Sequence, residues 1–342
     1  MPQPSFRAPP CPPRHSAPAI AAGRGFVAWA VAILLAGCSA SAPEGNAKGA
    51  GSAGPAAVPR VALVMKSLAN EFFASMADGA RAHHAAAPGR YELLVNGMRN
   101  ETDVAEQVTL VEQMVARKVA AIVIAPADSR AMVPALQRAA AAGIVVVNID
   151  NRLDADLLRE TGLAVPFVGP DNRAGARRAG EAVAARLAAG DEVAIIEGIV
   201  TAFNAQQRSL GLDDAARAAG LVVVDRQSAQ WEMEKADTVA AGMLSAHPRL
   251  AAILCANDSM ALGAAAAVAA ARRKVLVSGF DNIPAVAPLL ADGRIVATVD
   301  QHGDRLAAEG IETALAIVAG DAPPEDRDTP VDLIVAPVAT GP

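Results

Sequence analysis

The sequence predicts an α/β protein built from two similar lobes, each with a doubly wound parallel sheet. Short runs rich in Val and Ile recur along the chain, and they are continuously apolar rather than alternating. Strands buried on both faces of a parallel sheet have this pattern. Helix-length stretches of ~10–18 residues separate the runs, which is typical of βαβ units. About ten strands are too many for one ordinary sheet, and 342 residues are enough for two domains.

Two series of strands are expected, with helices between them. The first series is Val61–Lys66, Tyr91–Asn96, Ala120–Ala125, Ile144–Ile149 and Val165–Gly169, and the second is Glu192–Glu197, Leu221–Asp225, Ala251–Ala256, Val275–Phe280 and Ile295–Val299. Helices are expected at Glu71–Ala87, Asp103–Arg117, Arg173–Ala189 and Ser259–Ala271. Gly143, Gly190 and Gly220 stand where a helix would end before a strand, a place that favours the left-handed conformation of glycine.

The N-terminus has the features of an export signal. Three arginines precede an uncharged run from Gly25 to Ala36, which is too short to span a membrane but suits a signal peptide. The run ends in Leu35-Ala36-Gly37-Cys38, which resembles the bacterial lipobox. We expect a signal peptide over 1–37, lipidation of Cys38 and a flexible linker over 38–59. The protein would then lie in the periplasm or at the cell surface, anchored to a bacterial membrane by lipid. An ordinary signal peptide with a chance cysteine is the alternative.

Composition excludes several classes of protein. With 30 Lys and Arg against 36 Asp and Glu, and no basic cluster, nucleic acid is not an expected partner. Three cysteines are too few for a disulfide scaffold, and one long apolar run is too few for a multispan membrane protein. Cys255 lies in an apolar run and is expected in the core. No cofactor is expected, because a location outside the cytoplasm argues against ATP- or NAD-dependent chemistry. No metal is expected, because no H-E-x-x-H zinc motif occurs.

Polar side chains gather where the predicted strands end, which is where open parallel sheets bind ligands. They are Lys66, Asn70, Asp150, Asn151, Arg152, Asp171 and Asn172 in the first series, and Glu197, Asn204, Arg208, Asn257, Asp258, Asp281, Asn282, Asp300 and Gln301 in the second. Carboxylates, amides and guanidinium groups together suit a ligand covered in hydroxyls. Any single Asp or Asn could instead be a turn or capping residue. That alternative is weaker for the set, since Lys66, Arg208 and Gln301 are not capping residue types.

Aromatic residues gather at the same strand ends. After Cys38 the chain has seven of them, and five lie in or just after the polar ends, namely Phe72, Phe73, Phe203, Trp231 and Phe280. Aromatic rings stack on the apolar faces of sugars and polyols. A core position is the simpler interpretation for an isolated Phe, whereas the pair Phe72-Phe73 and Trp231 favour ligand contact.

Seven segments resemble, in order, parts of the ribose- and allose-type periplasmic sugar-binding proteins. They are Val64–Phe73, Val147–Arg152, Gly169–Asn172, Ala194–Gly198, Cys255–Met260, Gly279–Asn282 and Ala297–Gln301. The resemblance implies an extracytoplasmic solute receptor of an ABC importer with the type I periplasmic binding protein fold, in which two Rossmann-like lobes joined by a multi-crossing hinge close on a sugar. It implies an N-terminal lobe of 60–170 and 302–330, a C-terminal lobe of 171–301 and 331–342, and crossings near 170, 301 and 330.

The resemblance also implies the ligand contacts. Carried over position by position, they are Lys66, Asn70, Phe72, Phe73, Asp150 and Asn151 in the first lobe, and Asn204, Gln206, Arg208, Trp231, Asn257, Phe280, Asp281 and Gln301 in the second, with a structural role as the alternative for Arg208. Ribose-type members carry Arg where this chain has Asn151 and Gln206, and Ser where it has Lys66, a position at which allose-type members have Lys. We therefore expect an uncharged hexose, pentose or sugar alcohol, and not ribose itself. The expected partners are this ligand, an ABC permease and ATPase, and the membrane through the lipid, with the protein a monomer.

Three other functions are alternatives. A sugar-sensing repressor would need a basic helix-turn-helix before residue 60, where this chain has the expected signal peptide and linker. An enzyme would need a recognisable motif, yet Val64–Asn70 is not G-x-G-x-x-G and no phosphate loop or zinc motif is found. His83, His84, His247 and His302 have no evident nucleophile to activate. A receptor that presents its ligand to a chemotaxis or signalling partner is not distinguished from a transport receptor by one chain.

Overall fold

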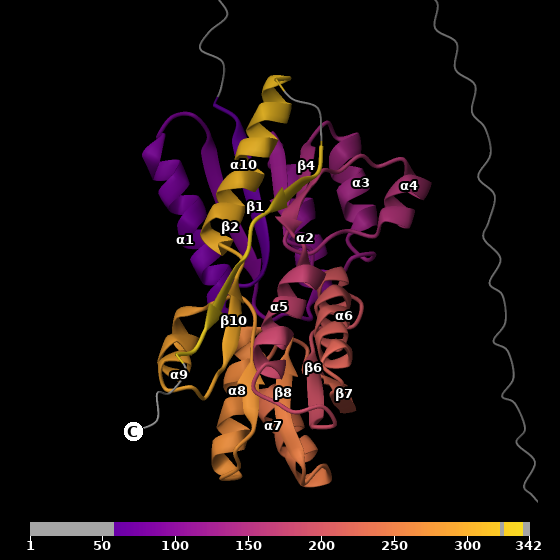
Figure 1. Ribbon diagram of the computed structural model, residues 1–342. Coiled ribbons are helices and arrows are strands. Elements are labelled where there is room, and N and C mark those ends of the chain that lie inside the picture. The colour runs from indigo at the N-terminus through magenta and orange to yellow at the C-terminus, as the bar shows by residue number, and fades with distance from the viewer. Residues whose placement is uncertain (1–57, 322–324, 338–342) are drawn as a thin grey trace, which may run out of the picture. The chain divides into compact units, whose positions relative to one another are not determined.

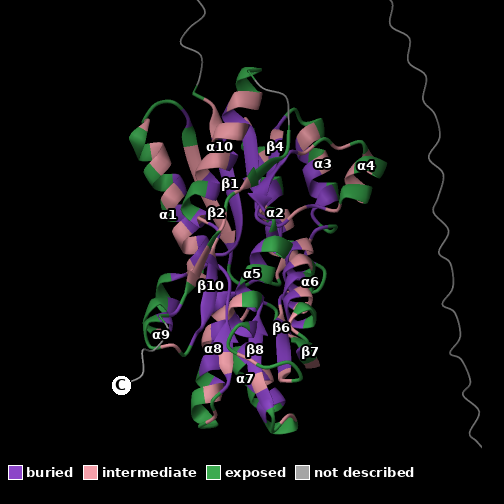
Figure 2. Ribbon diagram, viewed as in Figure 1, coloured by how far each residue is buried: buried purple, intermediate pink, exposed green. Residues whose placement is uncertain are grey.

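The chain forms two α/β lobes in the computed structural model, which describes residues 58–321 and 325–337 (Figure 1). Each lobe is a six-stranded sheet with helices on both faces. The sheets and the helix faces that cover them are buried, and the outer helix faces are exposed (Figure 2). The predicted fold class is therefore confirmed.

The first lobe has a fully parallel sheet with the strand order β11-β5-β4-β3-β1-β2. Its strands are β1 (Arg60–Ser67), β2 (Glu92–Met98), β3 (Ala121–Ile124), β4 (Val145–Ile149), β5 (Phe167–Pro170) and β11 (Arg327–Thr329). Its helices are α1 (Glu71–Ala86), α2 (Val104–Ala116), α3 (Val133–Ala141), α4 (Ala155–Thr161) and α10 (Gly303–Ala319). Helices α1 and α10 pack together over one face, and α2 and α3 over the other.

The second lobe repeats this arrangement with the order β12-β10-β9-β8-β6-β7, in which only β12 is antiparallel to its neighbour. Its strands are β6 (Glu192–Glu197), β7 (Val222–Ser228), β8 (Leu250–Cys255), β9 (Leu276–Ser278), β10 (Ala297–Asp300) and β12 (Asp332–Val335). Its helices are α5 (Asn172–Ala184), α6 (Phe203–Ala218), α7 (Met233–Ala246), α8 (Asp258–Ala270), the 3-10 turn η1 (Pro284–Val286) and α9 (Ala287–Ala291).

The chain passes between the lobes three times. It leaves the first sheet after β5, returns after β10 into α10, and crosses again between β11 and β12. Strand β11 forms an edge of the first sheet, and β12 forms an edge of the second. In each lobe, the central strands have their carboxyl ends on the side that faces the other lobe (Figure 1). The two sets of strand ends therefore meet between the lobes.

All ten expected strands are present, with ends within three residues of those predicted. The short strands β11 and β12 were not predicted, because Arg327–Thr329 and Asp332–Val335 are too short to give an apolar pattern. The helix expected to reach Ala189 ends at Ala184, where the N–H groups of Arg186 and Leu187 bond to carbonyls three residues back. Gly143, Gly190 and Gly220 have φ of +80°, +91° and +69°, the left-handed conformation that their positions predict.

Close packing of α5 against α6 fixes the position of α6. A Cβ atom on Gly211 of α6 would lie 2.2 Å from the carbonyl oxygen of Arg173 on α5, so only glycine allows these two helices to approach this closely. The approach fixes α6 against the second lobe. Helix α6 carries Asn204 and Arg208, and its first turn faces the first lobe.

The signal peptide over 1–37, Cys38 and the linker up to residue 57 lie outside the described residues and stay predictions. In the part of the chain that is described, the helices are all too short or too polar to cross a membrane. Cys255 is buried in β8, as expected, and burial raises the pKa of its thiol.

Candidate ligand-binding site

A cavity between the lobes is lined by twelve side chains, six from each lobe. They are Lys66, Asn70, Phe72, Phe73, Glu101 and Asp150 from the first lobe, and Asn204, Arg208, Trp231, Asn257, Asp281 and Gln301 from the second. Most of them lie at or just beyond the carboxyl ends of strands. Little free space remains between these side chains, so the cavity suits a small molecule.

Eleven of the fourteen residues predicted to bind ligand line this cavity, and three do not. Asn151 is buried behind it, and Gln206 is exposed and donates a hydrogen bond to the carbonyl oxygen of Val200. Phe280 lies under Arg208, with the guanidinium carbon 3.8 Å from the ring centroid. Glu101 was missed, although it follows β2 by three residues. Its neighbours in Asn100–Asp103 have the residue types of an ordinary turn and helix cap, which hide this signal.

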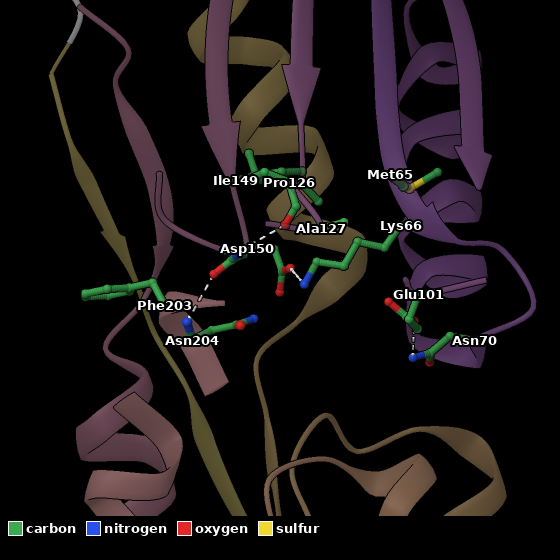
Figure 3. Close-up of polar contacts among 12 residues, drawn as sticks. Met65, Lys66, Asn70, Glu101, Pro126, Ala127, Ile149, Asp150, Phe203 and Asn204 are labelled. Atoms are coloured by element: carbon green, nitrogen blue, oxygen red, sulfur yellow. Dashed lines mark hydrogen bonds and ion pairs between the residues drawn. The ribbon is translucent and has the colours of Figure 1, made fainter. Parts of the chain in front are cut away.

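An ion pair forms the wall of the first lobe. Lys66 Nζ lies 2.9 Å from Asp150 Oδ2, and both side chains are almost completely buried (Figure 3). The ammonium group is 5.4 Å from the ring centroid of Phe73 and 5.8 Å from that of Trp231, within cation–π range. Lys66 is therefore held between a carboxylate and two aromatic rings, and it has little freedom to move.

A guanidinium group fixes the wall of the second lobe. Arg208 Nη1 donates to the carbonyl oxygen of Ala256 at 3.1 Å and to Asp281 Oδ1 at 3.2 Å, and its Nε donates to Asn172 Oδ1 at 2.7 Å. Gln301 Nε2 donates to the same oxygen of Asp281 at 2.7 Å. Arg208 thus has the structural role that was the alternative for it, and it also lines the cavity.

Two asparagines serve both as helix caps and as cavity lining. Asn70 Oδ1 accepts from the N–H of Phe72 at the start of α1, and Asn257 Oδ1 accepts from the N–H of Met260 at the start of α8. The capping interpretation is therefore confirmed for both residues, and ligand contact stays a prediction. Because helix N-termini carry partial positive charge, α1 and α8 add favourable potential for ligand oxygens from opposite lobes.

Buried polar atoms without a hydrogen-bond partner are concentrated in this cavity. Among the described residues nine such side-chain atoms occur, and six belong to residues that line the cavity: Glu101 Oε2, Asp150 Oδ2, Asn204 Oδ1, Arg208 Nη2, Trp231 Nε1 and Gln301 Oε1. Asp150 Oδ2 still has its ion pair with Lys66. A buried polar group without a partner costs about 1–3 kcal/mol, and native proteins contain few of them. The six atoms include both donors and acceptors, so they match a ligand that offers both.

Unusual backbone conformations occur at the same place. Eight non-glycine residues have positive φ among the described residues, and Asp150, Trp231 and Asp281 have φ of 61°, 70° and 117°. Gln230, Asn282 and His302 adjoin cavity residues and share this property. Such strain persists where the surrounding structure holds it, often at binding sites. The strand ends are bent so that these side chains face the cavity.

The charges of the cavity nearly balance. Lys66 and Arg208 face three carboxyl groups, so the formal charge is −1 when all are ionised. Burial raises the pKa of Glu101 to about 7, although the positive charge of Lys66 lowers it. Burial likewise raises the pKa of Asp281 to about 8, although the positive charge of Arg208 lowers it. Both carboxyl groups therefore become neutral more readily than ordinary ones, and the formal charge is zero when one of them is neutral and +1 when both are.

Two side chains of the first lobe cap a helix of the second lobe. The residue before α6 is Ala202, which has no side chain able to cap the helix. The N–H of Phe203 instead donates to Ser129 Oγ at 2.9 Å, and the N–H of Asn204 donates to Asn151 Oδ1 at 3.1 Å. Asn151 thus bridges the lobes rather than lining the cavity.

No group of metal-ligating residues suited to hold an ion occurs among residues 58–321 and 325–337. Two of the histidines named above have structural contacts. His83 lies 2.8 Å from the hydroxyl of Tyr91 and 2.8 Å from Glu312, and His302 lies 2.9 Å from Asp332 at the crossing between the lobes.

Comparison with known proteins finds relatives along most of the chain. A family model described as periplasmic binding protein domain matches residues 61–322. The D-ribose/D-allose-binding protein of Pseudomonas aeruginosa is 52% identical over 312 residues, which are 90% of this chain and 97% of the relative. A solved ABC transporter solute-binding protein from Burkholderia multivorans has 52% identity and a TM-score of 0.80, covering 82% of this chain and 100% of its own. Another, from Actinobacillus succinogenes with bound D-allose, has 36% identity and a TM-score of 0.76, covering 81% and 98%.

Proposed function

We propose that this chain, which belongs to the periplasmic binding protein family of ABC importers, captures a neutral monosaccharide or sugar alcohol between its two lobes. The chain then delivers this ligand to an ABC importer. An allose-like hexose, a pentose or a polyol is the proposed ligand. The relative at 52% identity has both ribose and allose in its name, so D-ribose belongs among the candidates although Lys66, Asn151 and Gln206 differ from ribose-type members.

The observation that carries this proposal is the set of unpartnered polar atoms in the cavity. Trp231 Nε1 and Arg208 Nη2 are donors, and Asn204 Oδ1 and Gln301 Oε1 are acceptors. A sugar hydroxyl both donates and accepts, so one compact molecule with several hydroxyls can satisfy all of them. The wrong stereoisomer would leave one of these groups buried and unpaired, at a cost of about 1–3 kcal/mol.

Charge and shape support a neutral ring-shaped ligand. The small net charge gives no preference for an anionic or cationic ligand. Phe72 and Phe73 stand edge to face with ring centroids 5.1 Å apart, and Trp231 lines the cavity from the other lobe. Rings from opposite lobes can cover the apolar faces of a sugar.

Binding is proposed to stabilise the closed arrangement of the lobes, because only then does the ligand contact both walls. The caps on α6 contribute to the same arrangement, since opening the lobes would separate Ser129 and Asn151 from the N–H groups of α6. A second contact across the lobes joins Glu71 Oε2 to the N–H of Ala285, at 3.1 Å.

Ser129→Ala is expected to weaken sugar binding by roughly 3- to 10-fold, although Ser129 does not line the cavity. Loss of a helix cap costs about 1 kcal/mol, here only in the closed state, and a smaller closed population lowers the apparent affinity. Calorimetry with the sugar found in the screen below measures the effect. Ser245→Ala, on the exposed face of α7, is the matched control. Equal affinity of Ser129→Ala and wild type would show that the cap does not favour closure.

A thermal-shift screen against D-allose, D-ribose, other pentoses and hexoses, myo-inositol and glycerol tests the function. Ligand at about 100 times its Kd adds about 2.7 kcal/mol of stability. For a protein of this size we expect the melting temperature to rise by several degrees, at about 2–4 °C per kcal/mol. No turnover of the bound sugar is expected. A shift with none of these compounds, or a product accumulating with purified protein, would contradict the proposal.

The lipid anchor at Cys38 and a monomeric state are also proposed, the first on the lipobox-like Leu35–Cys38 segment. Association with membranes that is lost in Cys38→Ser is the deciding measurement for the anchor. A receptor for a chemotaxis or signalling partner is the second candidate function. Neighbouring permease and ATPase genes would favour the importer.

A further inference from the structure

Glu101 is a buried acid on the wall of the cavity, in the loop between β2 and α2. Its side chain is only 4% exposed. It lines the cavity and also a larger groove outside it. The cavity and the groove share three lining residues, which are Asn70, Glu101 and Trp231. Glu101 therefore separates the ligand cavity from the groove that leads to solvent.

The two oxygens of the Glu101 carboxyl group have different surroundings. Oε1 accepts a hydrogen bond from Asn70 Nδ2 at 2.9 Å, and this contact ties the loop to the start of α1. Oε2 is buried and has no hydrogen-bond partner. Figure 3 shows the carboxyl group next to Asn70, with the second oxygen on the side that faces Lys66. A carboxyl oxygen that is buried in a binding cavity without a protein partner is suited to a polar atom of the ligand.

We propose that Glu101 binds the sugar as a neutral acid, with Oε2 donating a hydrogen bond to a ligand hydroxyl while Oε1 keeps its contact with Asn70. This inference rests on the proposed function and adds a ligand contact to the set that the resemblance implies. Oε1 is the acceptor for Asn70, so Oε2 is the oxygen that carries the proton. Ligand binding removes the remaining water from the cavity, and this disfavours the ionised form further.

The charges around Glu101 allow its neutral form near physiological pH. Burial raises its pKa to about 7; Lys66 on β1 opposes the shift, as does the Asn70 contact, while Asp150 after β4 and Glu232 before α7 add to it. On the groove side lie Glu71, Arg99 and Glu234. Below about pH 7 the free protein holds the neutral acid already. Above that pH, binding must take up one proton from the buffer, so affinity falls by up to about tenfold per pH unit.

Calorimetry with D-allose and with D-ribose between about pH 6 and pH 8.5 tests the proposal, using wild type, Glu101→Gln and Glu101→Ala. Gln has the shape of the neutral acid and keeps an acceptor for Asn70 and a donor for the ligand. We expect Glu101→Gln to match wild type at low pH and to bind more tightly than wild type at high pH. Glu101→Ala should lose roughly tenfold or more in affinity at low pH. Glu112→Gln, on the exposed face of α2, is the matched control.

Proton uptake gives a second readout that needs only well-folded protein. Repeating the titration above pH 7 in buffers of different ionisation enthalpy counts the protons bound with the sugar. Asp281 also has a raised pKa, so the difference between wild type and Glu101→Gln assigns the proton to Glu101. Binding by Glu101→Gln that is tenfold weaker at low pH, an unaffected Glu101→Ala, or equal proton uptake in wild type and Glu101→Gln would overturn the inference. If wild type binds no sugar at all, the proposed function itself fails.

Discussion

Asp150→Asn is expected to lower the affinity for the sugar by roughly 100-fold or more. Asp150 lies at the end of β4 with φ of 61°, a conformation that Asn tolerates, and its carboxylate is the buried partner of Lys66. The carboxylate can accept hydrogen bonds from two ligand hydroxyls, and hydrogen bonds to a charged group contribute about 1.5–3 kcal/mol each. The amide of Asn replaces one acceptor by a donor and leaves the ammonium of Lys66 without its counter-charge.

Asn is preferred to Ala at this position because its oxygen still accepts from Lys66. A buried charge with no partner would cost about 3–5 kcal/mol, and the loss of binding would then be confused with unfolding. Asp78→Asn is the matched control, since this carboxylate is exposed on α1 and pairs only with Arg81. Calorimetry should show Asp78→Asn equal to wild type. Tight binding by Asp150→Asn would remove Asp150 from the site.

Gly198→Ala is expected to weaken binding by a similar factor, about 100-fold, without adding or removing any polar group. A Cβ atom on Gly198 would lie 2.1 Å from Cζ2 and 2.2 Å from Cε2 of Trp231, far closer than real contacts allow. The φ of Gly198 is not in the left-handed region, so the backbone accepts Ala. The indole ring must therefore move, and it leaves the position in which it lines the cavity between Lys66 and Arg208.

Tryptophan fluorescence provides the measurement, because Trp231 is the single tryptophan of the chain after residue 37. Its emission should change with the Gly198→Ala substitution itself and should respond little to added sugar. Gly242→Ala is the control, since no atom lies within 4 Å of the added Cβ on α7. That variant should bind normally and be more stable by about 0.5–1 kcal/mol. Normal binding by Gly198→Ala would mean that the ring position does not matter for the ligand.

Residue types that stand out from ordinary turns were visible in the sequence. Lys66, Arg208 and Gln301 lie at or beyond predicted strand ends and are not capping residue types, so they pointed to a site, and all three line the cavity. Asn70 and Asn257 could equally have been caps, and they are both caps and lining. In the sequence, the gathering of polar residues at strand ends and the resemblance to known sugar-binding proteins both favour the second role.

The places of other residues relative to the cavity could not be predicted from the sequence. Asn151 adjoins Asp150, yet its side chain turns away and accepts from the N–H of Asn204, 53 residues further along the chain. Phe280 adjoins Asp281 but stacks under Arg208. Glu101 stands among turn-type residues in the sequence, and only its burial and its contact with Asn70 place it on the cavity wall.

The sequence by itself determined the strands, the two lobes and the ends at which polar residues gather, because these depend on local apolar runs and on where they stop. The tertiary structure decided which of those polar side chains share one cavity and which support the walls behind it. Neighbouring residues at a strand end point in different directions, and their partners come from the other lobe or from distant loops. That choice depends on how the two sheets face each other, which no local pattern encodes.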